Sequence, residues 1–266
     1  MNRARDLPLL GRRVLITRPR SQSQNLYELI RASGGDGIIF PAIEITQRQV
    51  SDGEMRLFAE LAPGDILIFV SRNAVSFLTH ALDNPADRFE GLAVLAVGSG
   101  TAEALKKHGF NNVISPVRGS GSEAVLDLDL LQQKSVQGKK IVILRGAGGR
   151  ELLRDTLQQR GAEVAVVELY YRRRPSVDTA WVKKIWHQSP PDVIVITSGE
   201  GLKNLIDMTP EEERISLFNT RLVVVSDRVR DLAISSGFKS DPQVAEDAGD
   251  EQLMQAVIGL FRGKTK

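Results

Sequence analysis

Six short segments of the chain are almost purely apolar and rich in β-branched residues, and a polar or glycine-containing turn follows each of them. Continuous apolar runs, in contrast to alternating ones, are typical of strands that are buried on both faces. Such strands form parallel sheets covered by helices. We therefore predict six strands, at residues 14–17, 66–70, 92–97, 141–144, 193–197 and 222–225.

Helical patterns follow several of these runs. Leu26, Leu29 and Ile30 are spaced to share one helical face, and Gly34 is placed to end that helix. Strand, turn and helix repeated in this way predict an α/β fold. Two further predicted helices carry Leu152, Leu153 and Leu157 before Gly161, and Leu202, Leu205 and Ile206 after Ser198.

The two halves of the chain resemble each other. The segment 16–18 corresponds to 143–145, an offset of 127 residues (145 − 18), and the segment 69–71 corresponds to 196–198 with the same offset. Gly109-Phe110 corresponds to Gly237-Phe238 with an offset of 128 (237 − 109). We interpret this register as a tandem duplication, which predicts two similar α/β lobes.

Two extended stretches, at residues 40–45 and 168–173, occupy equivalent places in the two repeats. They could pair antiparallel as a hinge between the lobes, which would give a crossed arrangement of the chain. They could also be two unrelated entries into loops, and the pattern alone leaves both interpretations open.

The composition agrees with two ordinary globular domains, since the chain has 266 residues, 42% hydrophobic and 26% charged. Lys and Arg number 35 against 33 Asp and Glu, a balance too even to indicate a nucleic-acid or membrane-surface protein. The absence of cysteine excludes disulfides and thiolate chemistry. Residues 1–13 contain no apolar segment of the length of a secretory signal, and we expect a cytoplasmic protein.

Motifs for cofactors and metals are incomplete. Gly98-Ser99-Gly100 and Gly146-Ala147-Gly148 begin like dinucleotide fingerprints, but Glu103 and Glu151 stand where the third glycine would be. The three histidines are scattered without helical spacing, and no Gly-x-Ser-x-Gly segment is present. We therefore expect no cofactor and no metal.

Small polar residues and arginines follow the predicted strands at their carboxyl ends, where ligands of open α/β sheets bind. Helix N-termini at this edge favour carboxylates. Capping explains any single Ser or Thr, but it does not explain the arginines beside the caps. The sequence predicts a cleft between the lobes that holds a polyanionic organic molecule. The candidate binding residues are Arg18, Pro19, Ser71, Arg72, Asn73, Gly98, Ser99, Thr101, Ser122, Arg145, Gly146, Gly149, Thr197, Ser198 and Gly199.

Several of these segments form a recognisable series. Leu-Ile-Thr-Arg-Pro stands at 15–19, Phe-Pro-Ala-Ile-Glu-Ile at 40–45, Ser-Arg-Asn-Ala-Val at 71–75, and Ala-Val-Gly-Ser-Gly-Thr-Ala at 96–102. Leu-Arg-Gly-Ala-Gly-Gly-Arg-Glu-Leu at 144–152 with Gly-Ala-Glu-Val at 161–164 is the most specific part. In this order, and over residues 12–260, the chain resembles the uroporphyrinogen-III synthases.

The resemblance implies a fold class: two similar parallel-sheet α/β lobes, HemD-like and related to flavodoxin and Rossmann folds. A two-stranded antiparallel linker would join them, with the second lobe inserted in the first. The implied first lobe comprises residues 1–39 and 175–266, the second lobe 47–168, and the linker strands 40–46 and 169–174.

The resemblance also implies a cofactor-independent lyase of haem, sirohaem and cobalamin biosynthesis. Its substrate would be hydroxymethylbilane, which carries eight carboxylates and closes to uroporphyrinogen III with loss of water and inversion of ring D. The implied partners are this substrate and, in transient contact, hydroxymethylbilane synthase. A monomer that binds neither nucleic acid nor membrane is expected.

A linker-strand tyrosine of the family corresponds to Tyr170, and the resemblance gives it the role of hydrogen-bond donor to the leaving hydroxyl. Phenols stay protonated at neutral pH, as this role requires. Tyr171 is adjacent, and strand alternation lets only one of the two face the cleft. The alternative function is a two-lobed small-anion binding or sensor protein without catalysis.

Overall fold

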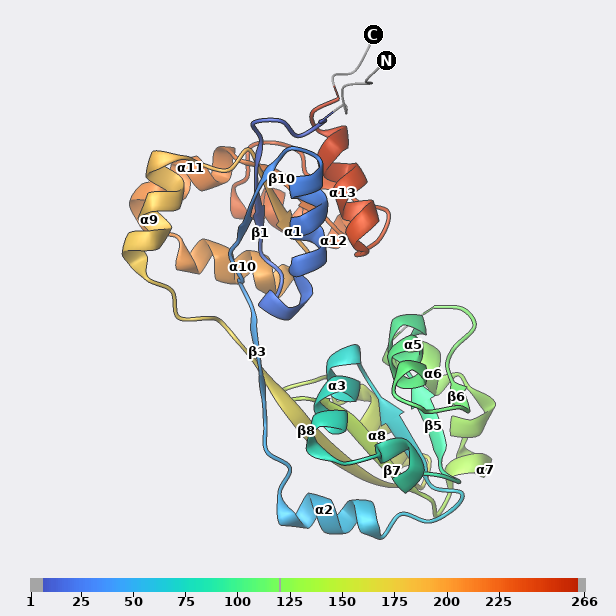
Figure 1. The fold of residues 1–266 in the computed structure, drawn as a ribbon. Coiled ribbons are helices and arrows are strands. Elements are labelled where there is room, and N and C mark those ends of the chain that lie inside the picture. Colours follow the sequence, from blue (N-terminus) through green and yellow to red (C-terminus); the bar gives the residue numbers. More distant parts are fainter. Residues whose placement is uncertain (1–6, 120, 263–266) are drawn as a thin grey trace, which may run out of the picture. The chain divides into compact units, whose positions relative to one another are not determined.

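A computed structural model describes residues 7–119 and 121–262, and it divides the chain into two compact units (Figure 1). Unit 1 comprises residues 1–44 and 173–266, and unit 2 comprises residues 45–172. The middle of the chain therefore forms unit 2, while both end segments contribute to unit 1.

Unit 1 contains a sheet in the order β11-β10-β9-β1-β2, in which all neighbouring strands are parallel. Val14 and Ile16 of β1 pack into the core under α1 and α13, whereas Leu15 packs into the core under α9 to α12. Both faces are therefore buried, as the continuous apolar runs predict. The strands are β1 (Arg13–Ile16), β2 (Asp36–Ile39), β9 (Val193–Ile196), β10 (Arg221–Val224) and β11 (Gln243–Val244).

The helices of unit 1 lie on both faces of this sheet. They are α1 (Gln24–Ala32), α9 (Thr179–Gln188), α10 (Gly199–Met208), α11 (Arg214–Asn219), α12 (Asp227–Ser236) and α13 (Asp250–Gly259), with 3-10 turns η1 (Arg20–Gln22) and η3 (Glu211–Glu213).

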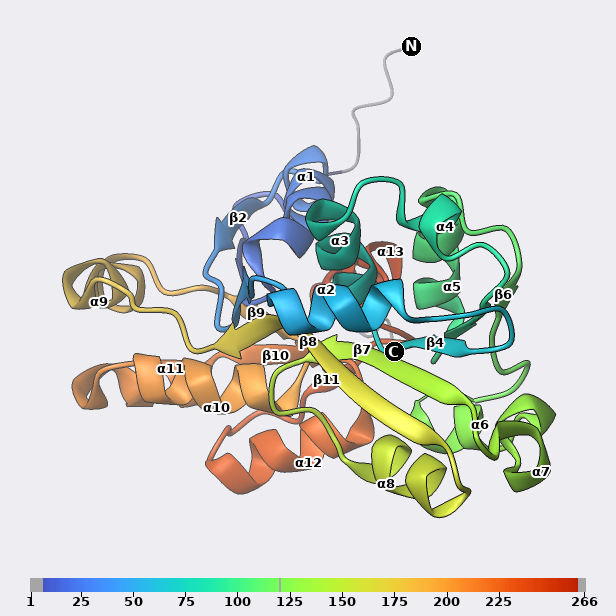
Figure 2. The ribbon, with the colours of Figure 1, turned by 90° about the horizontal axis from the view of Figure 1, so that it is seen from below.

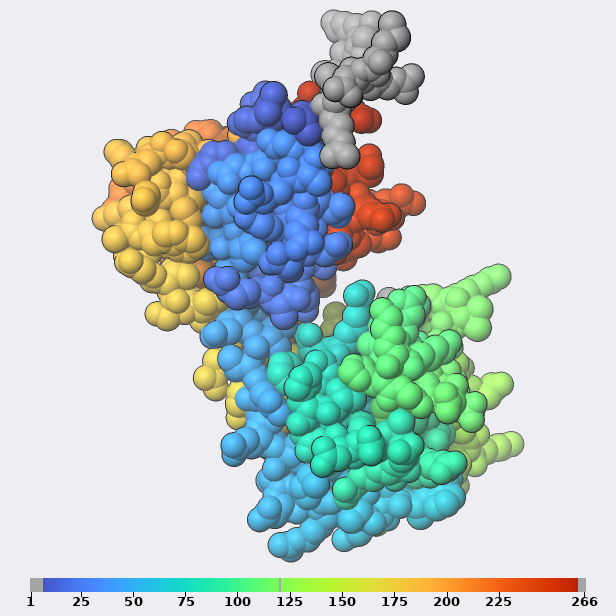
Figure 3. All heavy atoms as spheres, viewed as in Figure 1, coloured from blue at the N-terminus to red at the C-terminus, as the bar shows by residue number. Residues whose placement is uncertain are grey.

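Unit 2 contains the sheet β3-β8-β7-β4-β5-β6. Helices α2, α3 and α5 cover one face and α6, α7 and α8 the other, as Figure 2 shows on the two sides of β7 and β8. Helices α3 and α5 are in contact, and they share the face of unit 2 seen in Figure 3. The strands are β3 (Glu44–Gln47), β4 (Ile66–Phe69), β5 (Ala93–Ala96), β6 (Val113–Ile114), β7 (Lys140–Gly146) and β8 (Glu163–Arg173).

Two of the helices of unit 2 begin three residues after the carboxyl ends of central strands. These are α3 (Arg72–Ala81), which follows β4, and α5 (Ser99–Lys107), which follows β5. The others are α2 (Asp52–Ala59), α4 (Pro85–Arg88), α6 (Ser122–Leu126), α7 (Gln133–Val136) and α8 (Leu152–Gln159), with the 3-10 turn η2 (Asp129–Leu131).

The two parallel sheets have the same topology. The order β2-β1-β9-β10-β11 of unit 1 corresponds to β8-β7-β4-β5-β6 of unit 2, and the 127-residue offset relates β1 to β7 and β4 to β9. In each sheet the direction of winding reverses between two central strands, β1 and β9 in unit 1 and β7 and β4 in unit 2. Ligands of such folds bind at these switch points. The predicted class of two similar parallel α/β lobes is confirmed.

The six predicted strands are all present, and each of their ends lies within two residues of the predicted one. Strands β6 and β11 were not predicted, because two residues are too short for a pattern. The predicted helices after Ser198 and before Gly34 and Gly161 also form, with both glycines at positive φ (+84° and +86°). The face assigned to Leu152 is wrong: Leu153 and Leu157 are buried, but Leu152 is exposed.

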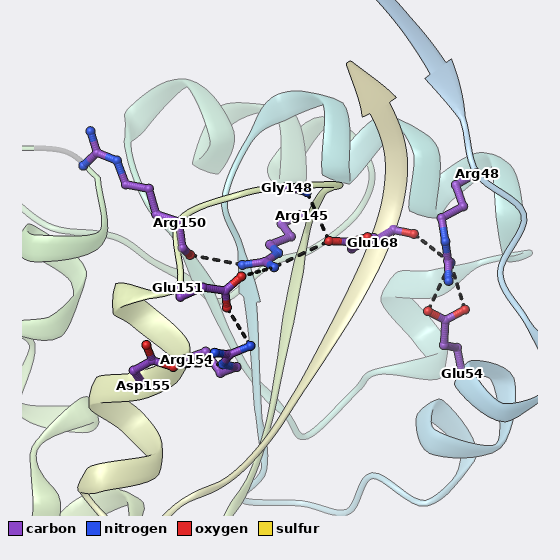
Figure 4. Close-up of polar contacts among 9 residues, drawn as sticks. All are labelled: Arg48, Glu54, Arg145, Gly148, Arg150, Glu151, Arg154, Asp155 and Glu168. Carbon is purple, nitrogen blue, oxygen red and sulfur yellow. Dashed lines mark hydrogen bonds and ion pairs between the residues drawn. The ribbon is translucent and has the colours of Figure 1, made fainter. Parts of the chain in front are cut away.

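The extended stretches at 40–45 and 168–173 pair in part, since β3, which begins at Glu44, is hydrogen-bonded beside β8. The N–H groups of Phe40 and Ala42 donate instead to the carbonyls of Ile16 and Thr17 at the end of β1. The backbone N–H of Arg48, just after β3, donates to the carbonyl of Leu169 at 2.9 Å. The two strands run in opposite directions (Figure 4). Of the two interpretations that the sequence left open, the unrelated loop entries are therefore wrong.

Candidate functional site

The best-defined polar site lies at the switch point of unit 2, where β4 and β7 end. Ser71 follows β4 in extended conformation and is the N-cap of α3, because its Oγ accepts a hydrogen bond from the backbone N–H of Ala74 at 3.1 Å. The same Oγ lies 2.9 Å from the phenol oxygen of Tyr170 on β8. Two residues 99 positions apart in sequence thus share one hydrogen bond.

The ring of Tyr170 is fixed on both sides. It stacks on Phe77 of α3 with 5.5 Å between ring centroids and 27° between planes. Gly146, at the end of β7, lies against the ring so closely that a Cβ there would be 2.4 Å from the Cε2 of Tyr170. Tyr170 is 4% exposed. Of the two adjacent tyrosines, Tyr170 is therefore the one that meets Ser71 in a fixed orientation.

Arg72, the first residue of α3, is exposed and has neither an ion-pair nor a hydrogen-bond partner among the described residues. Its guanidinium lies over the first turn of α5, where a Cβ on Gly100 would be 2.8 Å from Nε and 2.9 Å from Nη2. The N-cap of α5 is Gly98, which has no side chain to cap the helix, and Ser99 beside it is exposed. Arg72 therefore adds positive charge next to unoccupied backbone N–H groups.

Arg145, at the end of β7, has very different surroundings. It is 7% exposed, and its Nη2 lies 2.8 Å from Glu151 Oε1 and 3.5 Å from Glu168 Oε1. Nη1 donates to the carbonyl of Arg150 at 3.1 Å, as Figure 4 shows. Two carboxylates and a carbonyl thus already occupy the guanidinium that was predicted to bind substrate.

The carboxylate of Glu151 is held by charge. Its hydrogen bond from Arg145 lowers the pKa of Glu151 below its ordinary value, and the charge of Arg154 acts in the same direction. Arg154 lies 2.8 Å from Glu151 and from Asp155 (Figure 4). Glu151 stands where a dinucleotide fingerprint would have its third glycine, and here it forms ion pairs with Arg145 at the end of β7 and with Arg154 in α8.

Four other predicted residues of unit 2 are buried, half-buried or packed against a buried side chain. Thr101 is buried inside α5, and Ser122 is the half-buried first residue of the short helix α6. Asn73 is half-buried in α3. A Cβ on Gly149 would lie 3.0 Å from the Cδ of Arg145, so this glycine makes room for the buried arginine.

The predicted residues of unit 1 lie around the ends of β1 and β9. Arg18 forms an ion pair with Asp250 of α13, to which Asn25 also donates at 2.8 Å, and Pro19 is buried. Ser198 is the N-cap of α10 and accepts from the N–H of Gly201 at 3.0 Å.

Thr197 and Gly199, on either side of Ser198, are half-buried. The equivalent cap of α12 is Ser226, and the Asp227 beside it pairs with Arg230 at 2.8 Å. Capping therefore accounts for both Ser198 and Ser226.

Three residues of the site in unit 2 were not predicted from the sequence. Phe77 lies in α3 and stacks on Tyr170. Glu168 lies in β8 two residues before Tyr170 and accepts from Gly148, and Arg48, just after β3, donates to the carbonyl of Glu168. Phe77 has the pattern of an ordinary core residue. Regular alternation along β8 would place residues 168 and 170 on one side, but Tyr170 packs into the same core as Leu169, so no sequence pattern indicated Glu168.

Metal-ligating side chains do not cluster in the described part of the chain, where no group of three or more His, Cys, Asp or Glu could hold an ion. Within residues 7–119 and 121–262, no helix is long and apolar enough to cross a membrane.

These features define a two-lobed α/β protein made of two parallel sheets, with polar residues at the switch point of each sheet. The family model of uroporphyrinogen-III synthase HemD matches residues 24–255. The chain belongs to this family. It is 36% identical to the uroporphyrinogen-III synthase of Salmonella typhimurium over 92% of this chain and 99% of that protein. The corresponding identity to the Escherichia coli protein is 35%, with the same coverage.

Solved structures agree in fold. A mutant uroporphyrinogen III synthase from Thermus thermophilus aligns with a TM-score of 0.60 at 21% identity, covering 94% of this chain and 98% of that one. The uroporphyrinogen-III synthetase of Helicobacter pylori aligns with a TM-score of 0.61 at 16% identity, covering 94% and 99%.

Proposed function

We propose that this protein cyclises hydroxymethylbilane to uroporphyrinogen III in tetrapyrrole biosynthesis, with loss of water and inversion of the last pyrrole ring. Membership of the family, with 36% identity over 92% of the chain to a uroporphyrinogen-III synthase, is the observation that carries this proposal. A binding or sensor protein without catalysis is not favoured. The proposal includes a monomeric, cytoplasmic enzyme that needs no cofactor and has at most transient contact with hydroxymethylbilane synthase.

Tyr170 is the proposed catalytic residue, as the donor to the leaving hydroxyl. Since one lone pair of Ser71 Oγ accepts the N–H of Ala74, the hydroxyl proton of Ser71 can be directed at the phenol oxygen 2.9 Å away. The phenol proton is then free for the substrate, and a donor that itself accepts a hydrogen bond is polarised. This arrangement supports general-acid assistance by Tyr170.

The proposed reaction balances without a cofactor. The terminal C–O bond breaks and the hydroxyl leaves as water, with its second proton supplied from the phenol. The substituted α-carbon of the last pyrrole attacks the resulting cationic azafulvene and forms a spiro intermediate. The older methylene bond at that carbon then breaks, and the methylene cation so formed bonds to the other α-carbon of the same ring. The proton lost from that carbon as the ring regains aromaticity restores the phenol. The low exposure of Tyr170 supports its role, because a donor held in one orientation needs no ordering in the transition state.

Arg72 is the proposed carboxylate-binding residue of unit 2. The absence of a counter-ion among the described residues and the uncapped first turn of α5 beside it support this assignment. Ser99, exposed in that turn, is proposed as a second donor to the same carboxylate. Arg18 and the residues at 197–199 of unit 1 stay predictions as carboxylate contacts.

The decisive experiment is an isomer assay. The purified protein is incubated with hydroxymethylbilane, the products are oxidised to porphyrins, and the type I and type III isomers are separated by chromatography. We expect type III in excess, formed faster than the spontaneous type I product. Type I alone, at the rate without protein, would exclude the proposed function.

A further inference from the structure

The strand that carries Tyr170 departs from regular alternation just before that residue. Along β8, Val164 and Val166 pack into the core on the side of α6 to α8, and Val167 and Leu169 pack into the core on the side of α3. Alternation would turn residue 170 away from α3. Instead, Tyr170 packs into the same core as Leu169.

A bulge produces this change of side. The parallel register of β7 and β8 pairs Arg145 with Glu168 but Gly146 with Tyr170, so that Leu169 has no partner on β7. Bulges kink a strand locally and re-aim the side chain that follows. The extra residue at 169 therefore directs the phenol of Tyr170 toward Ser71.

Three successive carbonyls of the bulge are held by hydrogen bonds. The Arg48 side chain donates to the carbonyl of Glu168 at 2.9 Å, and the Arg48 backbone N–H donates to that of Leu169 at 2.9 Å. The N–H of Ala147 donates to the carbonyl of Tyr170 at 2.8 Å. Arg48 is fixed in turn, with Nη1 3.1 and 3.0 Å from the two carboxylate oxygens of Glu54 (Figure 4).

The side chain of Glu168 ties the bulge to the turn after β7. Its Oε1 accepts from the backbone N–H of Gly148 at 3.2 Å and lies 3.5 Å from Nη2 of Arg145 (Figure 4). That turn begins after Gly146, the last residue of β7, which lies against the Tyr170 ring. The Glu168 carboxylate thus connects β8, which carries Tyr170, to the turn after β7. The distance between these two segments determines the position of the Tyr170 phenol.

We infer that Glu168 and Arg48 are positioning residues that hold the bulge at Leu169 and so aim Tyr170 at Ser71. The effect of this positioning on catalysis rests on the proposed function of Tyr170. Displacements on the order of 1 Å in a catalytic group can lower turnover as much as 100-fold, so a device that fixes this one strand position would affect the rate without contacting the substrate.

The first test is spectroscopic and does not depend on catalysis. The protein has three tyrosines, so ¹³Cζ-tyrosine labelling gives three NMR signals, which Tyr→Phe variants assign. We expect Glu168→Ala to shift the Tyr170 signal, because the phenol loses its fixed distance to Ser71. Glu163→Ala removes an exposed carboxylate from the start of the same strand and should leave the signal unchanged. An unshifted Tyr170 signal in Glu168→Ala would overturn the inference.

The second test is kinetic. We expect Glu168→Ala to lower kcat about 10-fold with KM changed less than about twofold, because substrate contacts stay intact. Glu168→Gln keeps an oxygen for the Gly148 N–H and should stay within about threefold of wild type. If Glu168→Ala does not fold, Arg48→Met replaces it in both tests, since it removes the side-chain bond to the Glu168 carbonyl, together with the ion pair to Glu54, and keeps the backbone bond to Leu169.

A double-mutant cycle separates positioning from a general structural effect. In a Tyr170→Phe background, Glu168→Ala should lower kcat by less than about twofold, because the group that it positions is already gone. An undiminished 10-fold effect in that background would contradict the inference. A fully active Tyr170→Phe variant would reject the catalytic role of Tyr170 instead, while the NMR test of positioning would still stand.

Discussion

Three of the candidate binding residues are arginines near the carboxyl ends of parallel strands, and their surroundings differ. Arg18 is paired with Asp250, Arg145 is enclosed by Glu151 and Glu168, and Arg72 has no counter-ion among the described residues. A guanidinium that is already neutralised gains little from a substrate carboxylate. At the scale of single residues, Arg72 is therefore the one with the surroundings of a ligand-binding group.

Replacing Tyr170 by Phe tests the proposed donor. We expect kcat to fall about 10–100-fold, because one hydrogen-bond donor to the leaving group is lost. Thermal unfolding should change little, since the stacking on Phe77 is kept. Tyr171→Phe is the matched control and should keep wild-type kcat. A fully active Tyr170→Phe variant would move the donor role to another group.

Arg72→Gln should weaken substrate binding. We expect KM to rise about 10-fold in low salt and less in high salt, because salt screens the attraction between an exposed guanidinium and a carboxylate. Steady-state kinetics at two ionic strengths measure this effect. Arg88→Gln removes the same charge from exposed α4 and serves as the control. A KM that is unchanged at low salt would exclude Arg72 as a carboxylate ligand.

Arg145→Ala should act on stability. Removing this buried side chain leaves Glu168 and Glu151 without their shared partner, and we expect a loss of about 1–3 kcal/mol in the free energy of unfolding. Urea unfolding followed by circular dichroism measures it. If stability is unchanged while KM rises, the original prediction of a substrate-binding arginine would be favoured.

At the scale of elements, a capping box at the start of helix α2 holds Arg48, the residue that follows strand β3. Ser51 Oγ accepts from the N–H of Glu54, and the carboxylate of Glu54 accepts from the Ser51 N–H at 2.8 Å and also binds Arg48. Burial raises the pKa of Glu54, but the hydrogen bonds from Arg48 and Ser51 outweigh it, so the pKa lies below its ordinary value.

This shift predicts a pH dependence of stability. Because the folded pKa of Glu54 is lower than the unfolded one of about 4.3, its stabilising contribution is complete above that pH and is lost as the pH falls through the folded value. Glu54→Gln should therefore be less stable than wild type at pH 7, with a difference that shrinks in strong acid. Urea midpoints from pH 7 to pH 3 measure this.

Glu60→Gln, at the exposed end of the same helix, is the control for the capping box. Its ion pair with Lys140 is a surface pair at 3.4 Å and should contribute little at any pH. A constant difference between Glu54→Gln and wild type across this range would show that the charge of Glu54 does not contribute.

At the scale of the whole molecule, the two units use the chain differently. Unit 2 is one continuous segment, 45–172, with a core on each face of its sheet. The sheet of unit 1 needs both end segments, because β1 pairs with β2 on one side and with β9 on the other. Because unit 2 is a single chain segment with its own core, we expect it to fold without the rest of the chain.

A fragment of residues 45–172 should therefore unfold cooperatively by itself, in a single urea transition seen by circular dichroism. A fragment of residues 173–266 lacks β1 and β2 and should show no such transition, because the hydrogen-bonding edge of β9 that pairs with β1 would be exposed. A cooperative transition in the second fragment, or none in the first, would contradict this division of the chain.

Local patterns in the sequence were enough for six of the strands, the main helices, the repeat and the α/β class. A short, continuous apolar run is typical of a strand that is covered by helices on both faces. A duplicated sequence repeats the topology of the fold that it encodes. The candidate residues at the strand ends of unit 2 were predicted for the same reason, since the carboxyl edge follows from strand direction. Tyr170 came from resemblance to a family and not from the pattern.

Only the tertiary structure decided which of these residues are available. Ser71 meets Tyr170 across 99 residues, Arg18 meets Asp250 across 232, and Arg145 meets Glu168 across 23. The bulge at Leu169 depends on the register between two strands, which no local period records. Counter-ions and register arise from contacts between distant segments, so a sequence indicates the groups present while the fold determines which of them remain free to react.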